Sequence, residues 1–561
     1  MHNKKYKIFF LLAAFSISGI SFAQVENVQL NHPVYTFLKE MKVKKVISYF
    51  SEDVPNISRF YVKALLDSVK RSYNELSSTE RDLLKKYEIE FSDSLSNETT
   101  TRLFTPGKSF GSTLSDVFSN KVKYLYAYQE DNANVYIEGL GHFYHGQWLK
   151  HEVNNADLFN IGFRIRGTLF KHLGYLFSVI KGGVSGNKQL AETIEPRLKT
   201  NFKWVEAAEN IGNYDFASGY LKYHTEPSED MHLAIQLGRE PLTVGYGYGS
   251  KLVLSGDSPM MDFIQFNFDY GIVHFSSIHA STVGIFSRNR NDRYTKYWAF
   301  NRLKITFNNL FDIGIGESIV YSGRGLELGY LTPVVFYKFV EMSLQDRDNG
   351  NLYFDLQTNF IKNLELQATF FLDENILSHL DNLNLYTNKT AYQLGAFWYE
   401  AFTVENLSLI FEYTRIRPYV YTHFNIQNTY SAWGTNMGHR IGPNADEIFT
   451  KLAYNVNDWI RFSMEYRHQR SGENIYDADG NLVRNVGGDI FLTHGGNPVN
   501  KEAFFLDGIR INNDIFQAGF RIEPVRDFIF DIIYNYSIED HITEGFKQDY
   551  SYGLIKFTLE Y

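Results

Sequence analysis

The sequence predicts an all-β transmembrane barrel of about 18 antiparallel strands, preceded by a small N-terminal α-helical bundle. Three observations support this fold class. Segments of about ten residues alternate apolar and polar side chains, the connections between them alternate between tight and long, and aromatic residues make up 16% of the 561 residues. Long alternating strands, unequal loops at the two ends and interfacial aromatic belts are typical of outer-membrane barrels.

The composition excludes several classes of protein. The chain has no cysteine, which rules out a disulfide scaffold, a thiolate metal site and a cysteine nucleophile. Its formal net charge of −9 offers no basic surface for nucleic acid. We therefore expect no nucleic-acid partner.

Residues 1–23 read as a secretory signal peptide. Three lysines (Lys4, Lys5, Lys7) precede an apolar run from Ile8 to Ile20, and small residues at Ser21 and Ala23 predict cleavage after Ala23. The run is shorter than the roughly 20 residues of a membrane anchor. Farther along, no window of 18 consecutive apolar residues occurs, so the exported chain is expected to be either soluble or a closed barrel.

Residues 24–120 are predicted to form a periplasmic helical region and linker. One helix opens at Asn31-His32-Pro33 and runs through Met41, a second follows the cap Pro55–Ser58, and a third starts at the capping box of Ser77 and Glu80. Apolar residues recur every three or four positions in each, at Val34, Phe37, Leu38, Met41, Val62, Leu65, Leu66, Val69, Leu83, Leu84 and Tyr87. Short amphipathic helices of this kind form a folded cap, not a catalytic domain.

Residues 121–561 are predicted to form the barrel, because the hydrophobic period changes to two. The alternation is clear over 161–169, 364–373 and 528–537, and the segments are longer than the five or six residues of an average soluble strand. We predict strands at 134–143, 158–170, 172–183, 215–224, 231–238, 261–269, 272–283, 296–307, 311–321, 352–361, 363–372, 391–401, 405–416, 447–456, 458–468, 515–523, 527–537 and 551–561.

The connections and the last strand predict the location. Tight links at Lys171, Tyr270-Gly271, Asn308–Leu310, Lys362 and Asn457 alternate with long ones at 184–214, 239–260, 322–351, 417–446 and 469–514. Outer-membrane barrels have short periplasmic turns and long external loops. The chain ends in an aromatic residue, Tyr561, as in the signal that the barrel-assembly machinery reads. We therefore expect the outer membrane of a Gram-negative bacterium, with its lipid and that machinery as partners.

For two sequence motifs we favour a structural interpretation over a ligand-binding one. Gly245-Tyr-Gly-Tyr-Gly249 lacks the Lys-Ser/Thr and the strand–helix context of a phosphate loop, so it predicts a glycine-rich loop. Asp477-Ala-Asp-Gly-Asn481 has oxygen ligands that could hold calcium, but the apolar pairs on either side favour a hairpin with an Asp-Gly turn.

Catalysis is not expected. The histidines lie near serines such as Ser276 and Ser277, but nearness in sequence does not place a base and a nucleophile within hydrogen-bond reach, and both residue types are common in a lumen. The histidines concerned are His142, His145, His274 and His279. The sequence predicts no catalytic residue, no cofactor and no metal site.

Seven basic residues on polar strand faces should point into the lumen: Arg164, Arg166, Arg302, Lys304, Arg415, Arg461 and Arg467. We favour pairing with lumen carboxylates, for which the candidates are Asp355, Glu365, Glu412 and Glu465. The alternative is an interior that attracts anions, because guanidinium suits carboxylate and phosphate.

The order of a helical preface and then a barrel of this size resembles the Wzi-like capsule assembly family. The matching segments span most of the mature chain and are Asn31–Leu38, Ser58-Arg59, Leu76–Arg81 with Tyr87 and Phe91, Leu237–Glu240, Gly245–Gly247, Ser250–Ser255, Ile315–Ser318, Tyr330–Pro333, Glu341 and Asp373-Glu374. Each motif alone is weak, and their order carries the resemblance.

The resemblance implies a non-enzymatic, lectin-like outer-membrane factor for assembly or surface attachment of capsular polysaccharide. A related branch in gliding bacteria is linked to motility, and this chain could belong there. A porin or export channel for small solutes or polysaccharide is the alternative. A bundle that fills the periplasmic mouth would argue against conduction, whereas one that hangs aside would permit it.

The family's ligand residues cannot be carried over, so candidate polysaccharide contacts come from the loops. In loop 417–446, Trp433 and the segment Gly438–Pro443 could contact a glycan, because aromatic faces stack on sugar rings. The alternative is a loop that packs into the barrel and closes it. The candidates are Arg239, Tyr246, Trp433, His439 and Arg440.

Overall fold

A computed structural model of the protein describes residues 24–560, apart from 55–56, 151–153, 206–210, 288, 308–309, 375–381 and 495–500. The predicted signal peptide, Pro55 and Asn56 of the predicted cap, the predicted turn residues Asn308 and Asn309, and the terminal Tyr561 lie outside the described residues. No helix in the described part of the chain is long and apolar enough to cross a membrane.

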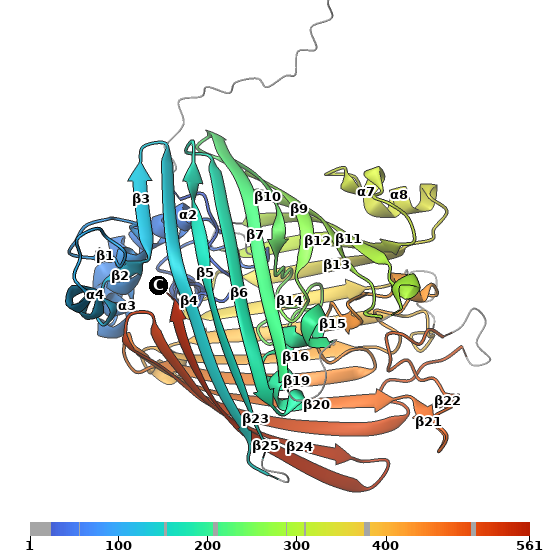
Figure 1. Ribbon diagram of the computed structural model, residues 1–561. Coiled ribbons are helices and arrows are strands. Elements are labelled where there is room, and N and C mark those ends of the chain that lie inside the picture. Colours follow the sequence, from blue (N-terminus) through green and yellow to red (C-terminus); the bar gives the residue numbers. More distant parts are fainter. Residues whose placement is uncertain are drawn as a thin grey trace, which may run out of the picture.

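The described chain forms a closed antiparallel barrel (Figure 1). All of the predicted strands are present, and several extend farther than predicted, most of all β7 and β23. The wall strands are β4 (Ala133–Trp148), β5 (Asn155–Leu169), β6 (Leu173–Gly186), β7 (Ile211–Ser228), β8 (Met231–Glu240), β9 (Met261–Tyr270), β10 (Val273–Val283), β11 (Thr295–Phe307), β12 (Phe311–Ser322), β13 (Asn349–Thr358), β14 (Leu364–Leu372), β15 (Thr390–Tyr399), β16 (Leu407–Ile416), β19 (Ala445–Asn455), β20 (Ile460–Glu473), β23 (Ile509–Val525), β24 (Phe528–His541) and β25 (Phe546–Glu560).

The barrel closes between its last and first long strands. β25 pairs with the second half of β4, from Trp148 opposite Tyr552 to Leu140 opposite Glu560. The extra strand β3 (Tyr126–Glu130), which the sequence analysis did not predict, pairs with the first half of β4. Closure leaves no sheet edge unpaired along the wall, as a strand in lipid requires.

The alternating pattern sorts side chains between the two faces of the wall as predicted. On β14, Glu365, Gln367 and Thr369 face inward and are at most 7% exposed. Their neighbours Leu366 and Phe370 face outward and are about 40% exposed (40% and 38%). The outward face is therefore apolar, as an outer surface in lipid must be.

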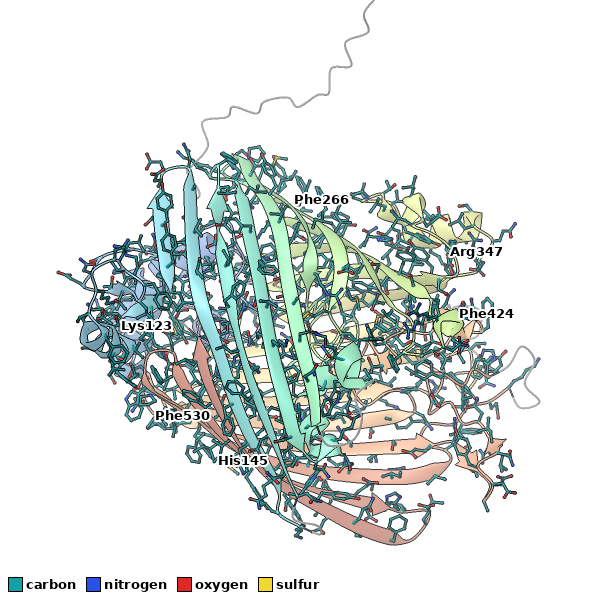
Figure 2. The ribbon with its side chains drawn as sticks, in the orientation of Figure 1. Lys123, His145, Phe266, Arg347, Phe424 and Phe530 are labelled. Atoms are coloured by element: carbon teal, nitrogen blue, oxygen red, sulfur yellow. The ribbon has the colours of Figure 1, made fainter. Side chains whose placement is uncertain are left out.

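Loop length differs between the two ends of the barrel, as predicted. At the short-turn end, the links between strands include Lys171, which adopts a left-handed φ of 65°, and Gly271. The opposite, long-loop end carries α5 (Lys188–Ile194), α6 (Phe202–Val205), α7 (Leu328–Leu331), α8 (Tyr337–Ser343) and the short strands β17 (Ser431–Ala432), β18 (Thr435–Asn436), β21 (Ile475–Tyr476) and β22 (Leu482–Arg484). Figure 2 places Lys123 toward the first end and Arg347 and Phe424 toward the second.

The N-terminal helices form where the capping signals and apolar spacing predict them. They are α1 (Val34–Val43), α2 (Arg59–Arg71) and α3 (Ser78–Phe91), and Ser77 and Glu80 make the predicted capping box. The structure adds α4 (Phe110–Val117) and a parallel pair, β1 (Thr100–Arg102) and β2 (Val122–Tyr124), which were not predicted.

Residues 24–93, here called the N-terminal segment, pack against the inside of the wall. The apolar faces of the three helices share a core with Phe397 and Tyr399 of β15. Lys39 of α1 binds the inward-facing Glu365 of β14, and Glu40 lies 3.1 Å from Arg461 of β20. Helix α1 thus lies inside the short-turn end, and the bundle does not hang aside, with the outer faces of α2 and α3 exposed.

Two long loops fold inward from the other end. The glycine-rich loop (residues 241–260) and the lid loop (residues 417–444) share an apolar core with wall residues such as Trp298 and Phe300. The hydroxyl groups of Tyr421 and Tyr430 donate hydrogen bonds of 2.8 and 2.7 Å to the carbonyl oxygens of Leu252 and Val253. The lid loop therefore packs into the barrel, which was the alternative reading of this segment.

Candidate functional site

The filling of the lumen is one-sided. Inward residues of β11 to β16 are buried against the N-terminal segment and the glycine-rich loop, whereas Ser463, Glu465 and Arg467 of β20 and their counterparts on β23 and β24 stay partly exposed. A cavity of about 280 Å³ lies on this open side. Its lining residues are Arg440, Glu465, Arg467, Gln469, Ile515, Gln517 and Asn535, and we call it the lumen cavity.

Strand register aligns the polar groups of the lumen cavity. Glu465 on β20 is opposite Gln517 on β23, which is opposite Asn535 on β24. Because side chains alternate along a strand, Arg467 follows Glu465 on the same inward face. Four inward side chains thus form a continuous polar patch on three neighbouring strands.

Arg467 supplies a charged hydrogen-bond donor on the strand wall of the lumen cavity. Its guanidinium lies 3.4 Å from the carboxylate oxygens of both Glu447 and Glu465, and 4.3 Å from the centre of the Phe449 ring. A guanidinium carries five N–H donors in a planar fork. Two carboxylates at 3.4 Å hold it in place without using all five, so it can also donate to a bound oxygen.

The opposite rim comes from the lid loop. Arg440 donates a hydrogen bond to the carbonyl oxygen of Gly249, and its guanidinium lies 3.7 Å from Asp257. These contacts tie the exposed Arg440 side chain to the glycine-rich loop. The lumen cavity is therefore bounded by a rigid wall on one side and by two interlocked loops on the other.

The glycine-rich loop is not an anion cradle. The N–H groups of Tyr248 and Gly249 donate to the Glu412 carboxylate at 2.7 and 2.9 Å. Gly247 has a φ of 147°, and a Cβ there would lie 2.3 Å from the carbonyl oxygen of Ser250. The glycines are needed for this turn into the lumen, which agrees with the predicted reading as a structural loop.

The five predicted contact residues are dispersed, and only Arg440 lines the lumen cavity. Tyr246 is buried inside the barrel with its ring 5.5 Å from the Arg302 guanidinium. Trp433 is half-buried and stacks on Phe286 at the rim, with 6.2 Å between ring centres. Their role in binding stays a prediction.

The other two predicted residues lie away from the lumen surface. Arg239 is on the outward face of β8, where it binds Asp262 of β9 at 2.9 Å. His439 belongs to the lid loop and is fully buried, and burial, together with the charges of Arg440 and Arg467, lowers the pKa of His439 well below its usual value. His439 is therefore neutral at pH 7.

Sequence reasoning named Glu465 and Arg467 only as lumen residues and missed Gln469, Gln517 and Asn535. The only sequence feature that marks these three residues is their position on the polar face of alternating strands. Many other residues share that signal, so it could not single them out.

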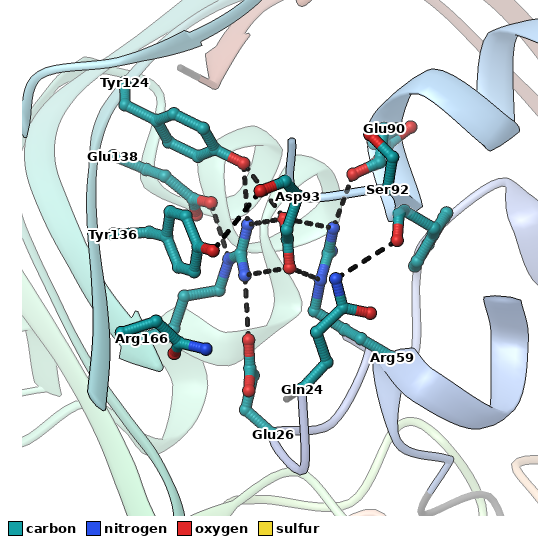
Figure 3. A network of polar contacts seen from close by, with 12 residues as sticks. Gln24, Glu26, Arg59, Glu90, Ser92, Asp93, Tyr124, Tyr136, Glu138 and Arg166 are labelled. Carbon is teal, nitrogen blue, oxygen red and sulfur yellow. Dashed lines mark hydrogen bonds and ion pairs between the residues drawn. The ribbon is translucent and has the colours of Figure 1, made fainter. Parts of the chain in front are cut away.

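Six of the seven basic residues are paired in the lumen, as we favoured, but several of their partners come from the N-terminal segment. The prediction is wrong for Arg415, which shares the outward face of β16 with Phe411 and lies 3.8 Å from the centre of the Phe505 ring. Arg302 binds Asp355 at 2.7 Å, as predicted, and also Asp53. Arg166 binds Glu26 at 2.8 Å and Asp93 at 3.0 Å. Figure 3 shows Asp93 between Arg166 and Arg59, with Tyr124 donating to its carboxylate. Two of the predicted acceptors have other partners. Glu365 binds lysines of α1, and Glu412 accepts hydrogen bonds from N–H groups of the glycine-rich loop.

The histidines considered for catalysis take part in other contacts. His142 lies 2.5 Å from Asn160, His145 lies 2.6 Å from Asp157, and His274 lies 2.6 Å from Asp269. His279 lies 2.9 Å from the Tyr321 hydroxyl.

The segment from Asp477 to Asn481 joins β21 to β22, so it is the predicted hairpin turn.

The anchor of the lid loop should make stability depend on pH. The Tyr421 N–H donates to Asp373 at 2.5 Å, and burial raises the pKa of Asp373 to about 7 although the Lys389 charge lowers it. The unfolded value is near 3.8, so between pH 4 and 7 only the folded state holds this proton, and stability falls as pH rises. The contribution is at most roughly 4 kcal/mol.

Replacing Asp373 with asparagine should remove that slope. We expect urea unfolding in phospholipid vesicles to show a smaller loss of stability from pH 5 to pH 8 in Asp373→Asn than in wild type. Asp479→Asn, in the exposed β21–β22 turn, is the control and should keep the wild-type slope. Equal slopes in Asp373→Asn and wild type would contradict the assignment.

Comparison with known proteins gives one family and several solved barrels. Residues 109–497, well over half of the chain, match the family model described as capsule assembly protein Wzi. None of the curated proteins matches the chain.

Among solved structures, the chain is similar to Wzi, described as an outer-membrane protein involved in group 1 capsule assembly in Escherichia coli and as a carbohydrate-binding β-barrel. The two are 11% identical with a TM-score of 0.54, over 95% of this chain and 98% of that one. OprD of Pseudomonas aeruginosa is 10% identical with a TM-score of 0.41, over 76% of this chain and 94% of that one.

Proposed function

Because this chain belongs to the Wzi family of capsule assembly proteins, we propose that it binds a surface polysaccharide in the lumen cavity and helps to attach that polymer to the cell. The chain is an outer-membrane β-barrel of a Gram-negative bacterium. The role is non-enzymatic and lectin-like. The gliding-motility branch and contacts with lipid and the barrel-assembly machinery stay predictions, as do the domain boundaries.

The observation that carries the proposal is the one-sided lumen. Its open wall presents the guanidinium of Arg467, the Glu465 carboxylate and the amides of Gln517 and Asn535. Sugar hydroxyls both donate and accept hydrogen bonds, and amide and charged side chains in a fixed row can satisfy them. Arg440 and Arg467 together favour a polymer that carries carboxylate or phosphate groups.

Weak single contacts are sufficient for this task. The cavity is at the small end of ligand sites, which span roughly 300–1,000 Å³, so it can hold only a short stretch of polymer. A polymer repeats its binding unit, and many barrels lie side by side in one membrane. Multivalency therefore retains a long chain although each site binds poorly.

The filled side of the lumen argues against the channel alternative. Backbone hydrogen bonds connect the glycine-rich loop to the N-terminal segment on one side and to the lid loop on the other. The Gly245 N–H donates to the carbonyl oxygen of Asp53 at 2.8 Å, and the Ser255 N–H donates to the carbonyl oxygen of Met437 at 2.9 Å. A conducting porin needs a continuous water-filled path, and three interlocked segments oppose one.

The proposal is tested in cells. Deleting the gene should release surface polysaccharide into the medium at least several-fold more than in the parent strain, with total synthesis unchanged, because the polymer loses its attachment. The wild-type gene should restore attachment. Equal retention by the deletion strain and its parent would contradict the proposed role.

A further inference from the structure

Three metal-ligating side chains meet at the short-turn end of the barrel. His224 and Glu226 lie two residues apart on β7, and His232 lies on β8 across the turn. One Glu226 carboxylate oxygen, Oε1, is 2.8 Å from Nδ1 of His232 and 3.4 Å from Nε2 of His224. The three ligand atoms all lie within 4.8 Å of one another.

The fold creates this cluster where the sequence shows no metal motif. Residues with a separation of two share a strand face, so His224 and Glu226 both point inward. The pairing of β7 with β8 shifts register between Thr225 and Ser228, next to the turn. The regular pairing ends with Thr225 opposite Leu233, so Glu226 and His232, the next residue on each strand, lie side by side at the end of the ladder.

The ligand set is that of zinc. Two imidazoles and one carboxylate are the protein ligands of many zinc sites that keep a fourth position open. Bonds of about 2.0–2.2 Å in a tetrahedron place ligand atoms about 3.4 Å apart. Glu226 already lies near this distance from both histidines, so binding requires only a small approach of the two imidazoles.

One histidine of the cluster is buried under a neighbouring ring, and the other is accessible to solvent. The ring of Phe60, on α2, lies 5.0 Å from the His224 ring and covers it, and the His224 side chain is only 8% exposed. The His232 side chain is 39% exposed. A cavity of about 320 Å³ is lined by both histidines and by the turn residues Asp230 and Gly271, so it reaches the short-turn end.

Charged side chains of both signs line the rest of this cavity. His274 lies 2.6 Å from Asp269, and the register of β8, β9 and β10 places His232 beside Asp269 and Asp269 beside His274. Lys222 and Lys304 also line the cavity, and Lys304 binds Asp53 at 2.6 Å. Among these groups, the Asp269 carboxylate is the one placed beside the proposed ligand His232.

We propose that His224, Glu226 and His232 bind one divalent transition-metal ion, with zinc as the expected ion and its fourth position facing this cavity. The short turns of outer-membrane barrels face the periplasm, so the ion enters from that side. Bound there, it fixes the β7–β8 hairpin and the imidazole on which Phe60 packs. The alternative is a hydrogen-bonded His–Glu–His cluster with no metal.

Zinc titration of the full-length protein in detergent tests the proposal. After treatment with a chelator, the wild type should bind one zinc ion per chain in calorimetry. His232→Gln and Glu226→Gln should each bind zinc at least tenfold more weakly, because each loses a ligand. X-ray absorption of the loaded wild type should show two nitrogen ligands and one carboxylate oxygen at about 2.0–2.2 Å.

The matched control is His145→Gln. His145 is also a half-exposed histidine paired with a carboxylate, Asp157, but it lies near the long-loop end of β4. This variant should bind zinc like the wild type, and all variants should keep the heat-dependent gel shift of a folded barrel. Absence of zinc binding by the wild type, or wild-type affinity in His232→Gln, would overturn the proposal.

Discussion

Replacing Arg467 with alanine is expected to weaken polysaccharide binding by about ten- to hundredfold. A hydrogen bond to a charged group contributes about 1.5–3 kcal/mol, and each 1.4 kcal/mol is a factor of ten in affinity. Arg467 is the charged donor on the wall of the lumen cavity, next to Glu465 at one end of the row that continues through Gln517 and Asn535. Gln517→Ala, which removes an uncharged group from the same wall, should weaken binding less.

Arg521→Ala is the matched control for this substitution. Arg521 lies on β23 and binds the carboxylate of Asp531 at 2.7 Å, but it does not line the lumen cavity. It should keep wild-type affinity. Calorimetric titration with surface polysaccharide purified from the producing bacterium measures all three variants. Equal weakening by Arg467→Ala and Arg521→Ala would show that the lumen cavity is not the binding site.

Replacing Asp93 with alanine is expected to loosen the N-terminal segment. Burial alone would raise the pKa of Asp93, but the charges of Arg166 and Arg59 lower it below its usual range, so Asp93 is a carboxylate that links two buried guanidinium groups. Removing one partner of a buried ion pair costs about 3–5 kcal/mol. We expect about 3 kcal/mol, because Arg166 keeps Glu26 and Glu138.

Limited trypsin digestion of the membrane-reconstituted protein measures this loosening. Cleavage within residues 24–93 should be much faster in Asp93→Ala than in wild type, while the barrel stays intact. Asp82→Ala, an exposed position on α3 of the same segment, is the control and should leave the rate unchanged. Unchanged cleavage in Asp93→Ala would mean that other contacts anchor the segment.

The wall of the barrel was predictable because its signal is local. Period-two alternation and unequal loops located every wall strand, since each strand must present apolar groups to lipid and polar groups to the lumen. The boundaries of β7 and β23 were less predictable. These strands continue past the apolar stretch, where pairing with a neighbour maintains them without an alternating pattern.

The filling of the lumen was not predictable. The partners of Arg166 and Lys39 are separated from them in sequence by many residues, and only the closed barrel brings Asp93 and Glu365 to them. Sequence reasoning therefore found the right kind of interaction and, for several residues, the wrong partner. The same limit applies to the lumen cavity: Arg440, which lines it, was among the predicted contacts, whereas Gln517 and Asn535 were not.

The aromatic residues lie in two different environments. Phe530 and Tyr534 belong to the outward face of β24, as the membrane belts require, but Tyr421, Tyr430 and Trp298 form the core between the lid loop and the wall. Composition alone counts both sets together. Only the inward fold of the long loops separates them.

Equilibrium binding of purified surface polysaccharide to the intact protein in detergent tests the central claim most directly. We predict saturable binding that is weakened about ten- to hundredfold in Arg467→Ala and kept in Arg521→Ala. An intact, folded protein that binds no polysaccharide but passes a large, steady current in planar bilayers would contradict the account and favour a channel.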